Sequence, residues 1–339
     1  MTRAAVLGTG AWGTTFAAVL ADAGREVTLW GISDDVCDEI TTQHTNSTFL
    51  PDIVLPPGVR ATTDAAAALE GADVVAIAIP AQVAGSALEP LAGLLEPNAV
   101  AVSLMKGVEL DTHRRMSQVV AEALGLGDDR IAVISGPNLA REIATRQPAA
   151  TVVASRHEPT AVHVARACAT SYFRPYTNTD VVGVELCGAV KNVIALAVGI
   201  AQGNGYGTNT SATVVTRGLV EITRLGLALG ADAETFAGLA GMGDLVATCM
   251  SPLSRNHTLG EHMGRGMSLE DAIRATGGTA EGVKTSASVL ELAATVGVEM
   301  PITAAVGAVL HHGLPVEQMA HLLLARPHKA EGVTGGRHR

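Results

Sequence analysis

The sequence predicts a doubly wound α/β domain in its N-terminal half and an all-α domain in its C-terminal half. Short apolar runs alternate with helical stretches up to about residue 180, and long helical patterns follow. Such strand–helix alternation is typical of a sheet covered by helices on both faces. The length of 339 residues also exceeds the range in which one hydrophobic core keeps growing. Two domains are therefore expected.

The strands of the first domain are predicted from continuous apolar or Val/Ile-rich segments, which fit strands buried on both faces of a parallel sheet. These segments are residues 4–7, 26–30, 73–79, 99–104, 130–135 and 151–154, with a short closing strand at 173–176. Candidate helices lie between them, at residues 13–23, 33–42, 82–91 and 112–123. The first domain is assigned to residues 1–180.

The second domain is assigned to residues 181–330, followed by a polar tail at residues 331–339. Its helical patterns cover residues 184–200, 211–229, 284–296, 301–310 and 315–324. A glycine-rich link at 203–210 joins the first two, which predicts an antiparallel helical pair. Residues 184–201 are apolar enough to suggest a membrane span, but they include Glu185, Lys191 and Asn192. Charges there are costly in lipid, so a buried helix is predicted.

Composition excludes several classes of protein. Hydrophobic residues make up 47% of the chain, which is enough to build cores and argues against disorder. The net charge of -10, without a basic run, argues against nucleic-acid or anionic-membrane binding. Four well-separated cysteines are interpreted as reduced, buried thiols of a cytoplasmic protein. They are Cys37, Cys168, Cys187 and Cys249.

A glycine-rich turn follows the first predicted strand and opens the first helix. Gly8 permits the tight turn, Gly10 lets a pyrophosphate approach the backbone, and Gly13 allows close helix–strand packing. The helix N-terminus offers N–H groups and partial positive charge to the phosphates. With the second strand in the expected place, this predicts a Rossmann-type dinucleotide site. The apolar run after Arg3 is therefore interpreted as this unit and not as a secretory signal.

The choice of cofactor stays open on this pattern. An NAD-specific site usually has an acidic residue at the end of the second strand, to bind the ribose hydroxyls. This chain has Trp30 and Gly31 there, followed by Ile32. The absence of an acid leaves room for a 2′-phosphate, yet no Arg or Lys is present to hold it.

Six further clusters combine small turn residues with phosphate-friendly side chains. They are Leu104-Met105-Lys106-Gly107, Ser135-Gly136-Pro137-Asn138-Leu139-Ala140, Gly188-Ala189-Val190-Lys191-Asn192-Val193, Gly241-Met242-Gly243-Asp244-Leu245, Ser254-Arg255-Asn256 and Ala280-Glu281-Gly282. In this order they resemble bacterial-type NAD(P)-dependent glycerol-3-phosphate dehydrogenase, from about Val6 to about Leu324. The resemblance implies reversible reduction of dihydroxyacetone phosphate to sn-glycerol 3-phosphate, which supplies the glycerophospholipid backbone.

The resemblance also implies roles for single residues. Lys191 is the proton donor and acceptor, because hydride addition to a ketone builds negative charge on its oxygen. Asp244 offsets charge and holds the lysine, and Arg255 offers phosphate a planar fork. The implied substrate contacts are Lys106, Gly136, Asn138, Lys191, Asp244, Ser254, Arg255 and Asn256. The implied cofactor contacts are Gly8, Gly10, Ala11, Trp12, Gly13, Ile32, Lys106, Ala140, Arg255, Thr279 and Glu281.

Two positions depart from the resembled family. A basic residue that helps to bind the 2′-phosphate is often present where this chain has Ile32, so NADPH is favoured over NADH only by the resemblance as a whole. A basic residue common just after the glycine-rich link is Ser211 here. His257 is interpreted as a solvated histidine at a helix start. Without a His/Asp/Glu cluster at ligand spacing, no metal is predicted.

Three alternatives compete with this interpretation. The same fold and lysine could reduce a β-hydroxyacid or ketopantoate-type substrate, which carries a carboxylate in place of the phosphate. A specialised paralogue could act on a related phosphorylated or phosphonate ketone. A non-catalytic nucleotide sensor would bind the cofactor, but it has no need for Lys191 and Asp244 together. A small-molecule substrate and a homodimer are the expected partners, with no nucleic acid and no membrane span.

Overall fold

A computed structural model describes residues 2–277 and 280–325 of the chain. The chain divides into two compact units, and each is described by itself. The first unit comprises Met1–Lys106 and Met116–Val181, and the second comprises Gly107–Arg115 and Val182–Arg339. The polar tail expected at residues 331–339 lies outside the described residues.

The first unit is built on an eight-stranded sheet with the strand order β3-β2-β1-β4-β5-β6-β7-β8. The strands are β1 (Arg3–Leu7), β2 (Glu26–Trp30), β3 (Val59–Thr62), β4 (Ala72–Ile77), β5 (Val100–Ser103), β6 (Ile131–Ser135), β7 (Ala149–Ala154) and β8 (Phe173–Asn178). Neighbouring strands are parallel except β6 and β7. The predicted parallel sheet therefore contains one antiparallel pair. The connection between these two strands contains only the short helix α6 (Ala140–Ala144), and the chain enters β7 at the edge where β6 ends.

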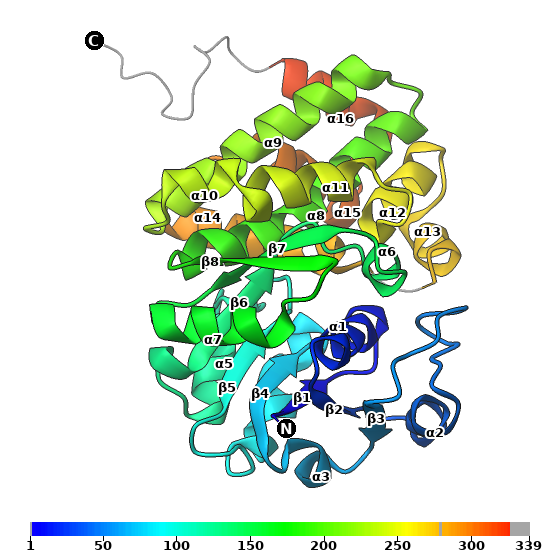
Figure 1. Cartoon of the computed structure of the whole chain (residues 1–339). Helices are drawn as coiled ribbons and strands as arrows, with labels where there is room; N and C mark the ends of the chain where they lie inside the picture. The colour runs from blue at the N-terminus through cyan, green and yellow to red at the C-terminus, as the bar shows by residue number, and fades with distance from the viewer. Residues whose placement is uncertain (1, 278–279, 326–339) are drawn as a thin grey trace. The chain divides into compact units, whose positions relative to one another are not determined.

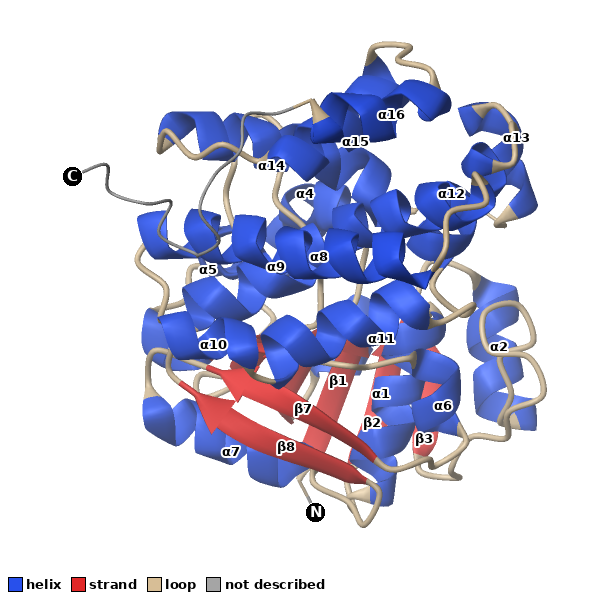
Figure 2. Cartoon of the chain, turned by 90° about the horizontal axis from the view of Figure 1, so that it is seen from above, coloured by secondary structure: helices blue, strands red, loops and turns tan. Residues whose placement is uncertain are grey.

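Helices cover both faces of this sheet, which confirms the doubly wound α/β fold (Figure 2). One face packs against Phe16 and Val19 of α1, and the other against Met116 and Val120 of α5. The helices are α1 (Ala11–Asp22), α2 (Asp34–Gln43), α3 (Ala65–Leu69), α4 (Ala84–Leu88), α5 (Met116–Leu124), α6 (Ala140–Ala144) and α7 (Glu158–Cys168), with short 3-10 turns at Ala81–Val83, Glu89–Leu91 and Asp128–Arg130.

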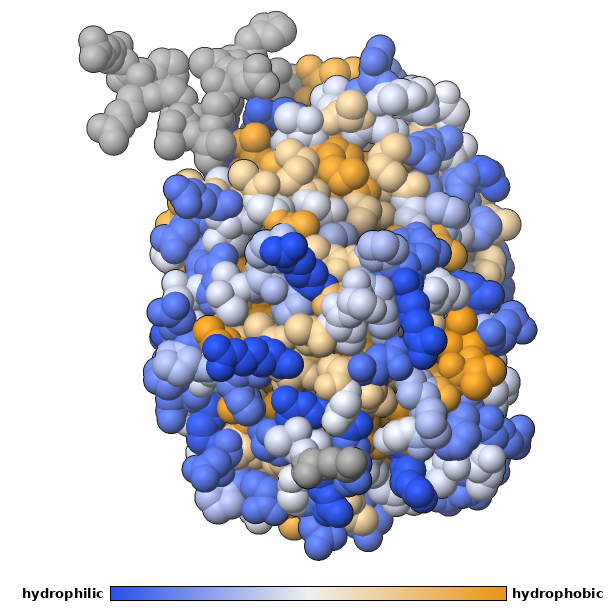
Figure 3. Space-filling model, in the orientation of Figure 1, coloured by the Kyte–Doolittle hydropathy of each residue, from blue (hydrophilic) through white to orange (hydrophobic). Residues whose placement is uncertain are grey.

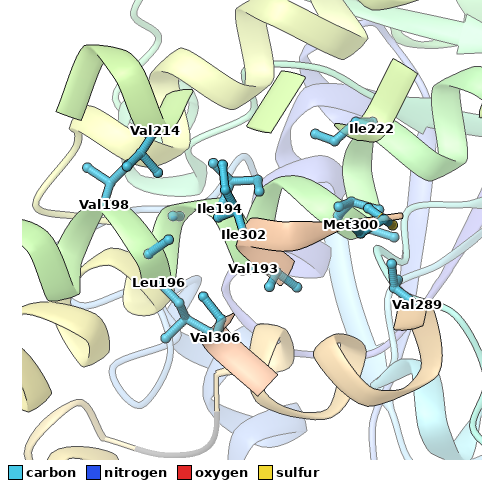
Figure 4. Close-up of a cluster of buried hydrophobic side chains, with 14 of the residues drawn as sticks. Val193, Ile194, Leu196, Val198, Val214, Ile222, Val289, Met300, Ile302 and Val306 are labelled. Carbon is cyan, nitrogen blue, oxygen red and sulfur yellow. The ribbon is translucent and has the colours of Figure 1, made fainter. Parts of the chain in front are cut away.

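From Val182 onward the described part of the second unit is helical, as predicted (Figure 1). Its elements are α8 (Val181–Gly203), α9 (Thr208–Ala228), α10 (Ala233–Ala237), a π-helical turn at Leu239–Gly243, α11 (Asp244–Met250), α12 (Arg255–Gly264), α13 (Leu269–Ala275), α14 (Glu281–Thr295), α15 (Pro301–His311) and α16 (Val316–Leu324). Val193 and Leu196 of α8 lie in one apolar core with Val289 of α14 and Ile302 and Val306 of α15 (Figure 4).

Helix α8 is the centre of this unit. Among the described residues it is the one helix long and apolar enough to cross a membrane, by length and composition alone, and 94% of its apolar window is buried inside the protein. Glu185, Lys191 and Asn192 each remain 6% exposed. The displayed face of the molecule carries hydrophilic residues interspersed with apolar ones (Figure 3). These observations agree with the expected buried core helix.

The segment Gly107–Arg115 leaves the sheet and belongs to the second unit. A helix was expected from residue 112, but Asp111 and His113 have φ values of 67° and 56°, which a right-handed helix does not accept. An isolated antiparallel bridge joins Val108 and Arg115 instead. The Arg115 guanidinium donates to Glu185 on α8 at 2.5 Å, with both side chains largely buried. The segment is therefore fixed to α8.

Candidate active site

The glycine-rich turn between β1 and α1 has the geometry predicted for a phosphate-binding loop. Gly8 has a φ of 117°, and a Cβ there would lie 2.6 Å from the carbonyl oxygen of Ala78. A Cβ on Gly13 would lie 2.1 Å from the carbonyl oxygen of Gly8, whereas one on Gly10 would meet nothing within 4 Å. The outer glycines are therefore needed for the fold. Gly10 keeps the side of the turn open for a ligand.

The residues around this turn fit a dinucleotide. Helix α1 begins at Ala11 with no side chain capping its first turn, so its N–H groups suit phosphate oxygens. The Trp12 ring packs on Phe16 with 5.8 Å between ring centroids. Its Nε1 is buried with no hydrogen-bond partner among the described residues. Buried N–H groups in native proteins are normally paired, so this atom is suited to a bound ligand.

The end of β2 determines how the adenosine part of a cofactor can be held. Gly31 is required because a Cβ there would lie 2.6 Å from Cγ2 of Thr9. Ile32 is 92% exposed and contributes no charge. Asp34 follows in the first turn of α2, where its Oδ1 accepts from the Thr63 hydroxyl at 2.8 Å. Ile32 thus offers no positive charge to a 2′-phosphate, and the choice between NADPH and NADH stays open at this position.

Four more predicted residues lie beyond the carboxyl ends of β5 and β6. Lys106 is half-buried, and its Nζ donates to the Gly136 carbonyl oxygen at 3.2 Å. The Asn138 amide donates to the Thr151 hydroxyl at 2.9 Å, and its Oδ1 is buried without a partner among described residues. The Ala140 carbonyl accepts from Thr15 of α1 at 3.2 Å. The structure thus brings these residues together within the first unit, at the sheet edge where α/β proteins bind ligands.

The second unit contains a buried cluster around Lys191. Lys191 lies in the middle of α8, and Asp244 is the first residue of α11. The Lys191 Nζ donates to Asp244 Oδ1 and, at 2.7 Å, to Thr248 Oγ1. These three residues are 6%, 1% and 5% exposed. An ammonium at this depth requires such partners, because an unpaired buried charge is very costly.

Thr248 was not predicted from the sequence. It lies four residues after Asp244 on the same helix, so both side chains are on one face. The four-residue spacing from Asp244 is the sequence signal from which Thr248 could have been predicted. The next residue, Cys249, is fully buried, and burial raises the pKa of its thiol to about 12 despite the opposing charge of Lys191. Cys249 therefore stays a neutral packing residue.

The Ser254-Arg255-Asn256 cluster forms the beginning of α12. Ser254 is the N-cap, and its hydroxyl accepts from the His257 N–H at 3.3 Å. Arg255 is exposed, and no described residue forms an ion pair with it. Asn256 is 8% exposed, and its Oδ1 accepts from the Gly282 N–H at 2.9 Å. The cluster is therefore a capped helix start with an exposed Arg255.

His257 corrects one expectation. It was interpreted as solvated, but it is 6% exposed, and its Nε2 lies 2.9 Å from Gln202 Oε1. Burial lowers the pKa of His257, and the nearby Glu261 carboxylate opposes the shift. The helix start was predicted correctly, whereas the environment was not.

The remaining predicted residues lie near the start of α14. Glu281 is the first residue of that helix. Thr279 lies outside the described residues. Within residues 2–277 and 280–325, no group of three or more His, Cys, Asp or Glu side chains could hold a metal ion.

A doubly wound sheet with this glycine turn, together with a helical unit that buries a lysine–aspartate pair, defines a dinucleotide-dependent dehydrogenase. The family models for the N-terminus and the C-terminus of NAD-dependent glycerol-3-phosphate dehydrogenase match residues 3–161 and 180–321. The chain belongs to the NAD-dependent glycerol-3-phosphate dehydrogenase family.

Individual relatives extend over almost the whole chain. The glycerol-3-phosphate dehydrogenase [NAD(P)+] of Streptomyces griseus is 59% identical over 329 residues, covering 97% of this chain and 98% of the relative. That of Thermobifida fusca is 58% identical over 332 residues, covering 98% and 99%. The crystal structure of glycerol-3-phosphate dehydrogenase from Coxiella burnetii superposes with a TM-score of 0.90 at 37% identity, covering 96% of this chain and 99% of that one.

A more distant similarity shows the fold alone. A ketopantoate reductase from Ralstonia eutropha superposes with a TM-score of 0.57 at 19% identity, covering 94% of this chain and 100% of that one.

Proposed function

We propose that this chain reduces dihydroxyacetone phosphate to sn-glycerol 3-phosphate with NADPH or NADH, in a reversible reaction. The observation that carries the proposal is the buried ammonium of Lys191, held by Asp244 and Thr248 in the same helical unit as the exposed guanidinium of Arg255. The Lys191 ammonium suits a developing alkoxide, and the Arg255 guanidinium suits a phosphate. The substrate is that of the named relatives.

Lys191 carries the proton in this reaction. The reduced nicotinamide, when bound, supplies a hydride to the ketone carbon. As negative charge develops on the ketone oxygen, Lys191 Nζ donates a hydrogen bond and then a proton to it. Asp244 and Thr248 hold the Nζ atom in place and keep a compensating charge beside it. In the reverse direction, Lys191 accepts the proton of the alcohol.

The substrate and the cofactor have proposed contacts of their own and share two, Lys106 and Arg255. Arg255 binds the phosphate with its planar fork, assisted by Ser254 and Asn256. Lys106, Gly136 and Asn138 complete the proposed substrate contacts. The proposed cofactor contacts among described residues are Gly8, Gly10, Ala11, Trp12, Gly13, Ile32, Lys106, Ala140, Arg255 and Glu281.

We assign this activity to the cytoplasm, where it supplies the glycerol phosphate of phospholipids, and to a homodimer. Exposed apolar side chains at Met242, Val246 and Met250, spaced four residues apart, support a second copy as partner. Sedimentation equilibrium tests the assembly, and a monomer at micromolar concentration contradicts it.

The direct test of the function is oxidation of NADPH and of NADH, followed by absorbance, with dihydroxyacetone phosphate as substrate. Turnover that saturates with this substrate supports the proposal, and the two cofactors compared at equal concentration give the preference. The matched controls are ketopantoate and a β-keto acid, which present a carboxylate in place of the phosphate. Turnover with a control ketone and none with dihydroxyacetone phosphate contradicts the proposal.

A further inference from the structure

The first turns of α12 and α14 are joined by one buried hydrogen bond. The backbone N–H of Gly282 donates to Asn256 Oδ1 at 2.9 Å. Asn256 and Gly282 are both buried, although 26 residues separate them in the sequence. The bond pairs one of the N–H groups that the start of a helix leaves without an intrahelical acceptor.

This bond fixes which way the Asn256 amide points. A backbone N–H can only donate, so the Asn256 atom that faces it must be the carbonyl oxygen and not the NH2 group. The Nδ2 group then occupies the other branch of the amide. No described residue is hydrogen-bonded to it. Asn256 therefore presents N–H donors on the first turn of α12, the helix that also carries Arg255.

Gly282 has no space for a side chain. A Cβ at this position would lie 2.8 Å from the carbonyl oxygen of Asn192, 2.8 Å from Asn256 Oδ1 and 2.9 Å from Leu196 Cδ1. Two of these atoms belong to α8, in the two turns that follow Lys191. The start of α14 thus packs directly on the backbone of α8 and on the Asn256 amide.

Helices α8 and α12 also meet at backbone distance. A Cβ on Gly199 would lie 2.1 Å from the His257 carbonyl oxygen, and one on Gly260 would lie 2.3 Å from the Leu196 carbonyl oxygen. One turn later, the same holds for Gly203 against Glu261 at 2.2 Å and for Gly264 against Ile200 at 2.4 Å. The separation of two helices depends on the side chains between them, and here there are none. The positions of Lys191 and Asn256 relative to each other are therefore set by main-chain contact.

We propose that Gly282 is a positioning residue for the substrate phosphate. Its N–H orients the Asn256 amide so that Nδ2 donates to a phosphate oxygen, and its missing side chain lets α14 dock on α8 and α12. This inference rests on the proposed function and deepens it. Gly282 thus favours a phosphorylated ketone over an unphosphorylated one through Asn256, without contacting the substrate itself.

The test uses a ratio that isolates the phosphate. The kcat/KM for dihydroxyacetone phosphate is divided by the kcat/KM for dihydroxyacetone, measured with the full-length chain and NADPH. The fraction of active enzyme cancels in this ratio, so a purely structural loss leaves it unchanged. Effects on the proton donor cancel in the same way.

The Gly282→Ala variant is expected to lower the ratio about tenfold or more, because a displacement of the Asn256 donor misplaces the phosphate. The matched control is Gly93→Ala, since a Cβ on Gly93 meets nothing within 4 Å. Its ratio is expected to stay within about twofold of the unmodified chain. An unchanged ratio in Gly282→Ala overturns the positioning role.

Two Asn256 variants keep the proposal testable if Gly282→Ala does not fold. Asn256→Asp retains an acceptor for the Gly282 N–H, and its charge is favoured at the N-terminus of α14. We expect its Tm to stay close to that of the unmodified chain while the ratio falls about 100-fold, since a phosphate donor is replaced by a negative charge. Asn256→Leu lacks the acceptor and is expected to lower both the Tm and the ratio.

The outcomes separate this inference from the proposed function. Equal loss of Tm in Asn256→Asp and Asn256→Leu contradicts the assigned amide orientation, and an unchanged ratio in both removes Asn256 from the phosphate site. Either result, with normal turnover of the unmodified chain, overturns this inference alone. If the unmodified chain does not reduce dihydroxyacetone phosphate, the proposed function fails first and this inference fails with it.

Discussion

The Nζ atom of Lys191 donates a hydrogen bond to Thr248 Oγ1 at 2.7 Å, and both side chains are more than nine-tenths buried. The same Nζ atom donates to Asp244 Oδ1. One charged donor is thus held by one charged and one neutral acceptor from a single face of α11. Because water has little access to this cluster, the interactions within it are stronger than at the surface. The arrangement suits the proton-donor role proposed for Lys191, and it makes removal of either charged partner alone costly for stability.

Replacing Lys191 with alanine is expected to lower kcat by about two to four orders of magnitude, the usual range for general acid–base catalysis. Loss of the proton donor affects the chemical step, so the Kd for NADPH is expected to change little. Stopped-flow and fluorescence titration measure the two quantities. Lys284→Ala is the matched control, because Lys284 is an exposed lysine of the same unit. Near-normal turnover of Lys191→Ala excludes the assigned role.

Removal of Asp244 is expected to reduce the free energy of unfolding by about 3–5 kcal/mol, since it leaves a buried ammonium without its counter-charge. Urea unfolding of Asp244→Leu measures this loss. The double variant Lys191→Met with Asp244→Leu is expected to recover most of the stability, because no buried charge remains, and to stay inactive. If the stability losses of the single variants simply add in the double variant, the two side chains do not interact as a buried pair.

Two neighbouring strands show what the apolar signal of the sequence could and could not predict. Residues 26–30 were predicted as a strand and form β2, because Val27 and Leu29 are buried on one face. Strand β3 was missed because only Val59 of its four residues is fully buried. The antiparallel direction of β7 has no local signal, since it depends on where the chain re-enters the sheet. The local apolar pattern thus predicts whether a segment forms a strand, whereas the direction of the strand in the sheet depends on the tertiary fold.

In the candidate site, too, local sequence patterns predicted some features and tertiary contacts determine the others. Lys191, Asp244 and Arg255 were predicted because each lies in a recognisable cluster of the sequence. The contact between Asn256 and Gly282 was not, because it joins helices whose pairing no local spacing reveals. His257 was assigned to solvent on polarity, but the close glycine-mediated packing of α12 on α8 buries it. The sequence thus proposes which groups react, while tertiary packing determines how they are held.

The cofactor preference can be tested at Ile32. This side chain is 92% exposed beyond the end of β2, so a larger residue fits there without repacking the core. Ile32→Arg adds a guanidinium that suits a 2′-phosphate. We expect the ratio of kcat/KM for NADPH over NADH to rise about tenfold or more, through a charge-assisted hydrogen bond.

Ile32→Gln is the control, since it adds length and polarity without charge. Steady-state kinetics at two ionic strengths provides a second check, because an exposed charge pair weakens as salt rises. If Ile32→Arg and Ile32→Gln give the same ratio at both salt concentrations, Ile32 does not lie near the 2′ position.

The buried His257 predicts how stability responds to acid. Its pKa in the folded protein is lowered by burial, so the folded state binds this proton less readily than the unfolded state does. The corresponding stability is fully present above the unfolded pKa of about 6.5, and it is lost as the pH falls from there toward the folded pKa. We therefore expect His257→Gln, which cannot take up this proton, to lose less stability than the unmodified chain between about pH 7 and pH 5. His312→Gln is the control, because His312 is exposed. Urea unfolding across this range measures the slopes, and equal slopes for the unmodified chain and His257→Gln would show that the proton reaches His257 in the folded protein as easily as in the unfolded one.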